Sequence, residues 1–460
     1  MTRYLKSRLA LGALASMLAI WSLANASQLA AQAEGNNAVV QGTSISYSTS
    51  YIDAGAVTGT SSQTDICAKI NAALGLISST FPSAVIDARG INSGLTCPAG
   101  DTPWSYGTST FAKAATILLP ARTIVINTGW ALPSGARIVG EGGGASSSSA
   151  TGGITTIQAC KSGVSGCTQN LSGAMLAMGT ASTAYCPSNV CTGVSIENLW
   201  LDGQGLSVNG IVNNYAQEQS TVKHVTLYQI GSSGLGVSPP TGVTGTPQNS
   251  GPYVDINCLA GSAPTSSTVC ARILGVSTRG IHGITCINTS STIPTNAIAL
   301  DASNNSIEDV KVQGFEYGIR VGASGTAKND LLLNVSGGND VSSVVLISNA
   351  NTVSDITILG VGNGGTGGAT DTITDNRTSP TTVLSDATVA MYVLGQQLTA
   401  GGTNIGYSRF TTSPSVPTWS NGNGTPSGSC KTGSLYSNTT GQSGSTWYLC
   451  GPTGAWSNVR

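Results

Sequence analysis

The sequence predicts an all-β protein built as a parallel β-helix, and three observations carry this prediction. Charged residues make up only 8% of the 460-residue chain, Gly accounts for 60 residues, and a short alternating apolar motif recurs along its middle. Ordinary soluble domains contain about 25% charged residues, which collect on the wet faces of helices. With 40% hydrophobic residues and a formal net charge of -1, the composition also excludes a disordered chain and a basic nucleic-acid-binding surface.

The recurring motif has the form apolar-x-polar-apolar-x-apolar. It occurs as "IENLWL" from Ile196, "VKHVTL" from Val222, "IEDVKV" from Ile307 and "VSDITI" from Val353. The first two lie 26 residues apart and the last two lie 46 apart, which is two turns of 23, whereas the middle interval of 85 requires extra loops or irregular turns. Short strands at a period of 20–50 residues indicate a solenoid whose turns stack their apolar side chains on one another.

The N-terminus has the pattern of a secretory signal peptide over residues 1–26. Arg3, Lys6 and Arg8 precede the apolar run "LALGALASMLAIWSLA", and Ala24-Asn25-Ala26 fits a small-x-small cleavage site. The alternative is a retained membrane anchor, but the run is shorter than the ~20 residues of a spanning helix. We therefore expect a secreted, cell-surface or periplasmic protein without a membrane span after cleavage.

Eleven cysteines support export to an oxidising compartment. Close spacing suggests local disulfides, although sequence alone does not fix their connectivity. The candidate pairs are Cys160 and Cys167, Cys186 and Cys191, Cys258 and Cys270, Cys430 and Cys450, and, more loosely, Cys67 and Cys97, which leaves Cys286 alone. No CxxC pair is present, and His224 and His282 lie outside any zinc-ligand spacing, so no metal site is predicted.

The remaining chain divides by composition. Residues 27–63 form an N-terminal extension, and residues 64–400 form the β-helix domain. "TDICAKINAALGLISS" from Thr64 predicts an amphipathic helix, capped by Thr64 or Asp65, that closes the open end of the β-helix. Residues 401–429 are a Pro/Ser/Gly-rich linker. Residues 430–460 form a small β module, stapled by Cys430 and Cys450, whose Tyr436, Trp447, Tyr448 and Trp456 form either a sugar-binding face or a core.

Several motifs resemble the pectate-lyase-like superfamily of right-handed single-stranded parallel β-helix proteins. They are "ILLPARTIVIN" from Ile117, "LPSGARIVGEGGG" from Leu132, "GGITTI" from Gly152 and "IENLWLDGQG" from Ile196. The resemblance covers roughly residues 64–400 and implies a right-handed β-helix. It implies activity only weakly, because the fold hosts lyases, hydrolases, tailspikes and adhesins. The "NTD", "DD" and "RIK" motifs of polygalacturonase-like members are missing, and "GIHG" at 280–283 is only a partial echo of "GHG", so no catalysis is assigned to His282.

Candidate site residues follow from the stacking of turns. A lyase needs Ca²⁺-binding carboxylates and a base, and a hydrolase needs two carboxylates. The catalytic candidates are Asp202, Glu197, Lys223 and His224, and stacking would place Glu197 beside Lys223. The substrate-binding candidates are Trp200, Arg320, Glu308 and Lys311, with Arg272 and Arg279 as further positive groups for a uronate. The alternative interpretation makes these residues solvated outward positions and turn caps, with Trp200 packed under a loop.

The sequence therefore predicts a secreted pectate-lyase-like β-helix that binds an extracellular polysaccharide and, if its acids converge, cleaves it as a lyase or a glycoside hydrolase. Ca²⁺ would be a cofactor only for a lyase. The alternative is a non-catalytic surface or adhesin-like structural protein. The scarcity of acidic residues favours this alternative, since only 20 Asp and Glu are spread along the whole chain.

Overall fold

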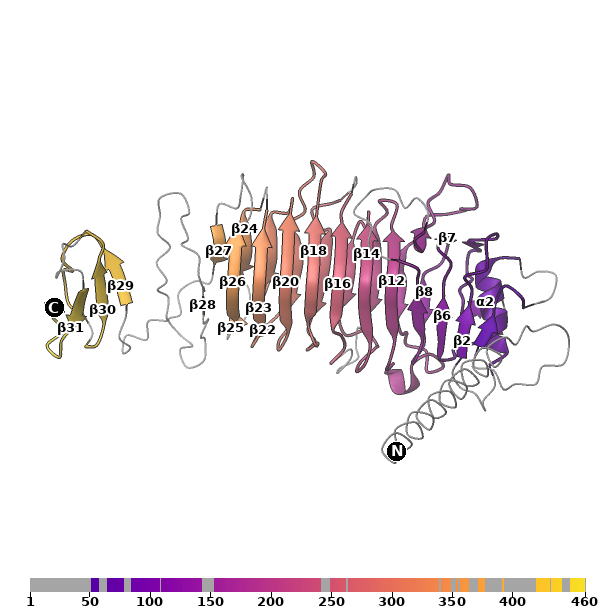
Figure 1. Cartoon of the computed structure of the whole chain (residues 1–460), viewed down its shortest axis with the longest axis horizontal. Helices are drawn as coiled ribbons and strands as arrows, with labels where there is room; N and C mark the ends of the chain where they lie inside the picture. The colour runs from indigo at the N-terminus through magenta and orange to yellow at the C-terminus, as the bar shows by residue number, and fades with distance from the viewer. Residues whose placement is uncertain are drawn as a thin grey trace, which may run out of the picture.

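The computed structural model contains a long stack of parallel strands and a separate small sheet near the C-terminus (Figure 1). The described residues are 51–57, 64–77, 84–107, 109–142, 153–240, 249–261, 264–338, 341–348, 353–354, 356–363, 371–376, 391–392, 419–430, 432–440 and 447–459. The predicted signal peptide, residues 1–26, lies outside them. No helix within these ranges is long and apolar enough to cross a bilayer.

The stack is formed mainly by two sheets, which we call the long sheet and the second sheet. The long sheet contains β1 (Tyr51–Asp53), β2 (Ala84–Asp87), β3 (Thr96–Cys97), β6 (Ala115–Leu118), β7 (Thr123–Ile126), β9 (Arg137–Val139), β10 (Thr156–Ala159), β12 (Ser195–Asp202), β14 (Thr221–Tyr228), β16 (Tyr253–Leu259), β18 (Ile281–Ile287), β20 (Ser306–Gln313), β23 (Leu331–Gly337), β26 (Thr357–Asn363) and β28 (Met391–Tyr392).

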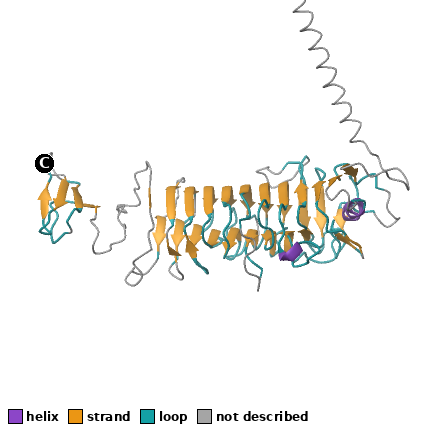
Figure 2. Cartoon of the chain, turned by 90° about the horizontal axis from the view of Figure 1, so that it is seen from below, coloured by secondary structure: helices purple, strands orange, loops and turns teal. Residues whose placement is uncertain are grey.

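The second sheet runs alongside it, and Figure 2 shows the strands of successive coils in rows. It contains β8 (Trp130–Leu132), β11 (Gly173–Met178), β13 (Val208–Asn213), β15 (Ser233–Val237), β17 (Val269–Leu274), β19 (Asn296–Asp301), β21 (Tyr317–Val321), β24 (Ser343–Ile347) and β27 (Asp371–Asp375). Two short strands, β22 (Ala327–Lys328) and β25 (Val353–Ser354), pair as a third sheet. The hairpin of β4 (Ser105–Tyr106) and β5 (Ser109–Thr110) and the 3₁₀ turn η1 (Pro187–Asn189) lie in loops.

From β12 to β27 each coil gives one strand to the long sheet and then one to the second sheet, and strands of neighbouring coils pair in parallel. This is the predicted parallel β-helix, and strand connections of this kind are almost always right-handed. Inward side chains such as Leu199, Val225 and Ile256 are essentially inaccessible to solvent and stack along the axis. Each such side chain contributes roughly 1.5–3 kcal/mol of hydrophobic stabilisation relative to exposure.

The register settles one interval of the predicted repeat and corrects one position. Val222 pairs with Tyr253, Tyr253 with Ile281, and Ile281 with Ile307, so the 85-residue interval holds three stacked coils lengthened by loops, the first of the two predicted possibilities. Leu332, one coil after Ile307, pairs with Ile358. The fourth repeat therefore starts at Ile358. Val353 was assigned to this position by the sequence but belongs to β25 of the third sheet.

The predicted capping helix is present as α2 (Ile66–Gly75). The Asp65 side chain caps it by accepting a hydrogen bond from the backbone N–H of Ala68 at 3.0 Å, and Ile66, Ile70 and Leu74 are buried against the first coils. β1 pairs with β2, so the long sheet begins within the segment predicted as an N-terminal extension. The helix thus covers apolar core at the first coils, as an end cap should.

All five predicted disulfides are formed. They join Cys67 to Cys97, Cys160 to Cys167, Cys186 to Cys191, Cys258 to Cys270, and Cys430 to Cys450. Cys286 is the free, buried cysteine among the described residues, and it is the register partner of Cys258. Burial raises the pKa of the Cys286 thiol, so it behaves as a small apolar core residue.

The C-terminal module is a four-stranded sheet in the order β29 (Trp419–Gly422), β30 (Leu435–Asn438), β31 (Trp447–Cys450) and β32 (Trp456–Asn458). β29 pairs with β30 in parallel, and the other pairs are antiparallel. The sheet therefore starts at Trp419, inside the segment predicted as a linker over 401–429.

Candidate functional site

The polar third position of the repeat coincides with a bend in each long-sheet strand. In seven successive coils the residue at this position has a positive φ: Asn198 (56°), His224 (53°), Asp255 (51°), Gly283 (75°), Asp309 (54°), Asn334 (53°) and Gly360 (65°). Gly, Asn, Asp and His are the residues that most readily adopt the left-handed region. Backbone conformation thus explains the residue types at this position, and we call these seven residues the bend column.

Two predicted candidates, Glu197 and Lys223, do lie side by side, as the stacking predicts. Glu197 is nevertheless held by other groups, because its carboxylate accepts hydrogen bonds from Arg137 and from the Ser195 hydroxyl, each at 2.6 Å. Partial burial raises the pKa of Glu197, but Arg137 and Ser195 outweigh it, and the pKa lies below its usual value. Glu197 is therefore an ionised anchor between coils.

Both histidines of the chain pair with a carboxylate from the next coil. His224 Nε2 lies 3.2 Å from Asp255 Oδ2, and His282 Nδ1 lies 3.1 Å from Glu308 Oε2. Lys311 lies on the same outer face as Glu308 and is exposed. The structure thus brings Glu197, Lys223, His224, Glu308 and Lys311 onto one face of the long sheet, where Glu197, His224 and Glu308 each have a partner in a neighbouring coil.

The bend column makes a prediction for His224. His224→Asn should leave the free energy of unfolding nearly unchanged, because Asn occupies the same position in other coils. His224→Val should lower it by about 1–2 kcal/mol, because a β-branched residue is strained at this φ. Guanidinium denaturation of the two variants measures the difference. Equal midpoints for both variants would remove the conformational explanation for this position.

Asp202, the preferred catalytic candidate, ends β12 as a turn cap. Its carboxylate accepts a hydrogen bond from the backbone N–H of Gln204 at 2.9 Å and contacts the side-chain amides of Gln204 and Gln158. Burial raises the pKa of Asp202, while these hydrogen bonds lower it less strongly. No second carboxylate contacts Asp202 among the described residues, so the acid pair of a hydrolase is not assembled here.

Trp200 is not the exposed stacking platform considered from the sequence. Only 2% of its surface is accessible, and its ring packs against Tyr228 of the next coil at 5.5 Å between centroids. The alternation correctly places Leu199 and Leu201 inside. It also places Trp200 on the outward side, but that side of the strand is covered as well, so the packed alternative holds. Trp200 is thus a packing residue, and it cannot contact a sugar in this structure.

A pocket lies elsewhere, on the second sheet. It is open, has a volume of about 270 Å³, and crosses β13, β15 and β17. Its lining consists mostly of amides and hydroxyls with one guanidinium: Asn209, Val212, Asn214, Ser232, Ser233, Gly236, Val237, Ser238, Ser267, Val269 and Arg272. This combination suits a polyhydroxylated ligand with a negative charge.

Gly236 and Arg272 shape this pocket. In register, Gly236 lies between Val212 and Arg272, and a Cβ at Gly236 would meet nothing closer than 3.6 Å. The missing side chain therefore leaves open space beside the guanidinium. Arg272 is exposed, and no acidic side chain pairs with it in the described part of the chain.

Arg320, the predicted uronate-binding residue, lies on this second sheet, two coils beyond Arg272 in the same column. Its Nε donates to Ser348 Oγ at 3.0 Å, and it does not line the pocket. The structure thus separates Arg320 from the acidic candidates on the long sheet. Arg272 lines the pocket together with Asn209, Asn214 and Ser238, and no sequence pattern predicted that these residues lie close together.

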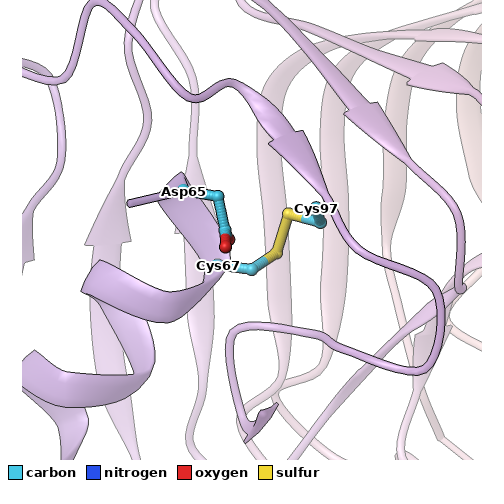
Figure 3. A group of neighbouring side chains, drawn as sticks. All are labelled: Asp65, Cys67 and Cys97. Atoms are coloured by element: carbon cyan, nitrogen blue, oxygen red, sulfur yellow. A yellow bond between two sulfur atoms is a disulfide. The ribbon is translucent and has the colours of Figure 1, made fainter. Parts of the chain in front are cut away.

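One group of potential metal ligands occurs in the described ranges, formed by Asp65, Cys67 and Cys97 at the start of α2 (Figure 3). The two sulfur atoms are joined in a disulfide, so neither is a thiolate ligand. Asp65 caps α2 and accepts a hydrogen bond from the Tyr106 hydroxyl at 2.5 Å. The cluster is structural, and its residues do not fit a metal ion.

Comparisons with known proteins show only distant similarity. No protein-family model and no curated sequence matches the chain. Among solved structures, ORF18 of Geobacillus virus E2 is similar over 75% of this chain and 62% of that one, with 11% identity and a TM-score of 0.37. The chain thus spans less than two thirds of that protein.

Two A-modules of Azotobacter vinelandii mannuronan C-5 epimerases are also similar. The AlgE4 A-module is similar over 61% of this chain and 89% of that one, with 13% identity and a TM-score of 0.28. The AlgE6 A-module is similar over 75% of this chain and 100% of that one, with 12% identity and a TM-score of 0.26. Likeness of this size carries no argument about activity. The stacked parallel sheets themselves are those of a parallel β-helix.

Proposed function

We propose that this is an exported polysaccharide-binding protein whose ligand, an acidic glycan, lies in the pocket of the second sheet. The unpaired guanidinium of Arg272, beside the space left by Gly236, is the observation that carries the proposal. A guanidinium binds a carboxylate with two parallel hydrogen bonds. The surrounding amides and hydroxyls, from Asn209, Asn214 and Ser238, offer donors and acceptors for sugar hydroxyls.

The pocket supports binding more strongly than cleavage. Its lining includes no carboxylate and no imidazole, whereas proton transfer to or from a sugar needs such a group within hydrogen-bond reach. The two histidine–carboxylate pairs lie on the long sheet. Binding is therefore the proposed activity, and cleavage by a lyase or hydrolase route is an outcome that the assay below detects.

Export is supported by the disulfides. Five are formed within a chain that begins with a signal-like segment, and disulfides persist mainly outside the reducing cytosol. We propose that the signal peptide is removed and that the folded protein acts outside the cytoplasm or at the cell surface.

Arg272→Ala tests the proposed site. We expect it to weaken binding of polygalacturonate or alginate oligosaccharides by about 10- to 100-fold, the usual loss for a charged hydrogen-bonded contact. Titration calorimetry measures the affinity, and Arg279→Ala, an exposed arginine outside the pocket, is the matched control. Equal affinities for wild type and Arg272→Ala would exclude this pocket.

The same samples, incubated with Ca²⁺ or with a chelator, separate binding from catalysis. New ultraviolet absorbance from an unsaturated sugar would indicate a lyase, and new reducing ends without it would indicate a hydrolase. Binding without products would support the proposal as stated. If no acidic glycan binds, the proposed function is wrong.

A structural role is the second candidate, and the long sheet favours it. Three side-chain pairs on its outer face join neighbouring coils: Arg137 with Glu197, His224 with Asp255, and His282 with Glu308. A ladder of this kind holds neighbouring coils together and leaves few groups for a ligand. Absence of glycan binding with retained surface attachment would support this second candidate.

A further inference from the structure

The C-terminal module has two chemically different faces. Side chains alternate across its strands, so residues two apart share a face. One face holds Tyr436, Tyr448 and Trp456, and the ring of Tyr436 lies 6.1 Å from that of Tyr448 and 5.9 Å from that of Trp456. This cluster, with the disulfide at Cys450, is the small core of the module.

The opposite face, which we call the module face, is apolar and accessible. Register places on it Leu435, Ser437, Trp447, Leu449, Ser457 and Val459. Their large side chains are exposed to an unusual degree: 37% for Leu435, 41% for Trp447, 40% for Leu449 and 45% for Val459. The other large exposed hydrophobic residues of the described chain, Val164 and Ile293, lie in the β-helix domain. Clustering of this kind marks an interaction surface.

The chemistry of the module face indicates the occupant. The residues that register places on the module face are uncharged, and the hydroxyls of Ser437 and Ser457 flank its apolar groups; the two basic residues of the module sequence, Lys431 and Arg460, lie outside the described residues. An uncharged sugar chain matches this face, since sugar rings have apolar faces that stack on an aromatic ring and hydroxyl edges that reach neighbouring polar groups.

We propose that the module face binds a neutral polysaccharide, with the Trp447 ring against a sugar ring and Leu435 and Leu449 extending the contact along β30 and β31. This site is separate from the pocket of Arg272, and its described residues are uncharged, whereas the pocket contains a guanidinium. Binding at the module face depends on apolar contact and is insensitive to salt, whereas a guanidinium–carboxylate contact weakens as salt rises.

Depletion from suspensions of microcrystalline cellulose and of chitin tests this proposal with the full-length protein. Wild type should be retained by at least one of them, equally at low and high salt. Trp447→Ala should weaken retention about tenfold or more, and Leu449→Ser should weaken it in the same direction. Arg272→Ala, the matched control, should be retained like wild type, which distinguishes this site from the proposed function of the pocket.

Limited proteolysis provides the folding control: each variant should resist cleavage within 419–459 as wild type does. Retention of Trp447→Ala equal to that of wild type would overturn the proposal, as would failure of wild type to bind either glycan. Light scattering provides a further arm. A dimer that becomes a monomer in Trp447→Ala, without any glycan retention, would assign the module face to self-association and reject the glycan.

Discussion

Asp330→Asn is expected to raise the free energy of unfolding at pH 8 by about 3–4 kcal/mol and to remove most of the loss of stability between pH 4 and pH 8. The carboxyl group of Asp330 is only 1% exposed. Burial raises the pKa of Asp330, and the hydrogen bonds from Asn305 lower it less strongly, which leaves the pKa at about 7. A shift from 3.8 to about 7 corresponds to roughly 4 kcal/mol.

The local structure explains why this carboxyl group is poorly stabilised as an anion. Inside the core, Asn305 Oδ1 accepts two hydrogen bonds from Thr278 of the preceding coil, and Asp330 Oδ1 accepts the backbone N–H of Asn305 at 2.8 Å. The corresponding position in the next coil is Ile356, and Asp330 Oδ2 has no hydrogen-bond partner among the described residues. Within the described part of the chain, the internal polar ladder thus ends on an oxygen that accepts no hydrogen bond.

The sign of the pH dependence follows from the raised pKa. Between about pH 4 and pH 7 the folded protein holds a proton on Asp330 that the unfolded chain has released, so stability falls as the pH rises through this range. Below pH 4 both states are protonated, and the Asn variant and wild type should differ little. Denaturation midpoints at pH 4 and pH 8 measure both values.

Asp309→Asn is the matched control, because Asp309 is exposed in the neighbouring coil and its Oδ1 accepts a hydrogen bond from Asn334 Nδ2 at 2.7 Å. It should change stability by less than about 0.5 kcal/mol at either pH. If Asp330→Asn were no more stable than wild type at pH 8, the buried carboxyl group would not be a source of the pH dependence.

The sequence predicted those parts of the fold that depend on local pattern. The strands from Ile196, Val222 and Ile307 are visible in the motif because their inward residues are Ile, Leu and Val. The coils from Tyr253 and Ile281 were missed, since an aromatic residue begins one and Gly283 stands at the polar position of the other. Both still satisfy the same requirement, a buried first residue and a left-handed third residue.

The candidate site was less predictable because it depends on register between distant coils. Arg272 and Gly236 become neighbours only when β15 and β17 are aligned, and the loops that separate them differ in length from coil to coil. The pocket also results from a missing side chain at Gly236, which no motif marks. Conversely, the acids that looked catalytic, Glu197 and Asp202, have structural partners that sequence spacing does not reveal.

Removal of the Cys430–Cys450 disulfide should have the second large effect, confined to the C-terminal module. The Cys430→Ser, Cys450→Ser variant loses a cross-link over a sequence separation of 20, worth about 3 kcal/mol in the chain-entropy model. A sheet of four short strands, whose core in the described residues is the cluster of Tyr436, Tyr448 and Trp456, has little stability in reserve to offset this loss. We expect the module to unfold while the β-helix, with its own four disulfides and continuous core, stays intact.

Limited proteolysis distinguishes the two parts of the chain. The double-serine variant should be cleaved within 419–459 under conditions in which wild type resists, and the surviving fragment should keep the thermal transition of the β-helix. Cys160→Ser, Cys167→Ser is the control, because it removes a disulfide across a sequence separation of only 7 within the β-helix domain and should leave the module protected.

Retained protection of 419–459 in the variant that lacks Cys430 and Cys450 would show that the aromatic cluster holds the module together without the disulfide. In that case the module would fold, and keep the module face intact, without its disulfide. If cleavage occurs, retention on neutral glycans should disappear with it, because Trp447 and Leu449 are set side by side only by the folded sheet.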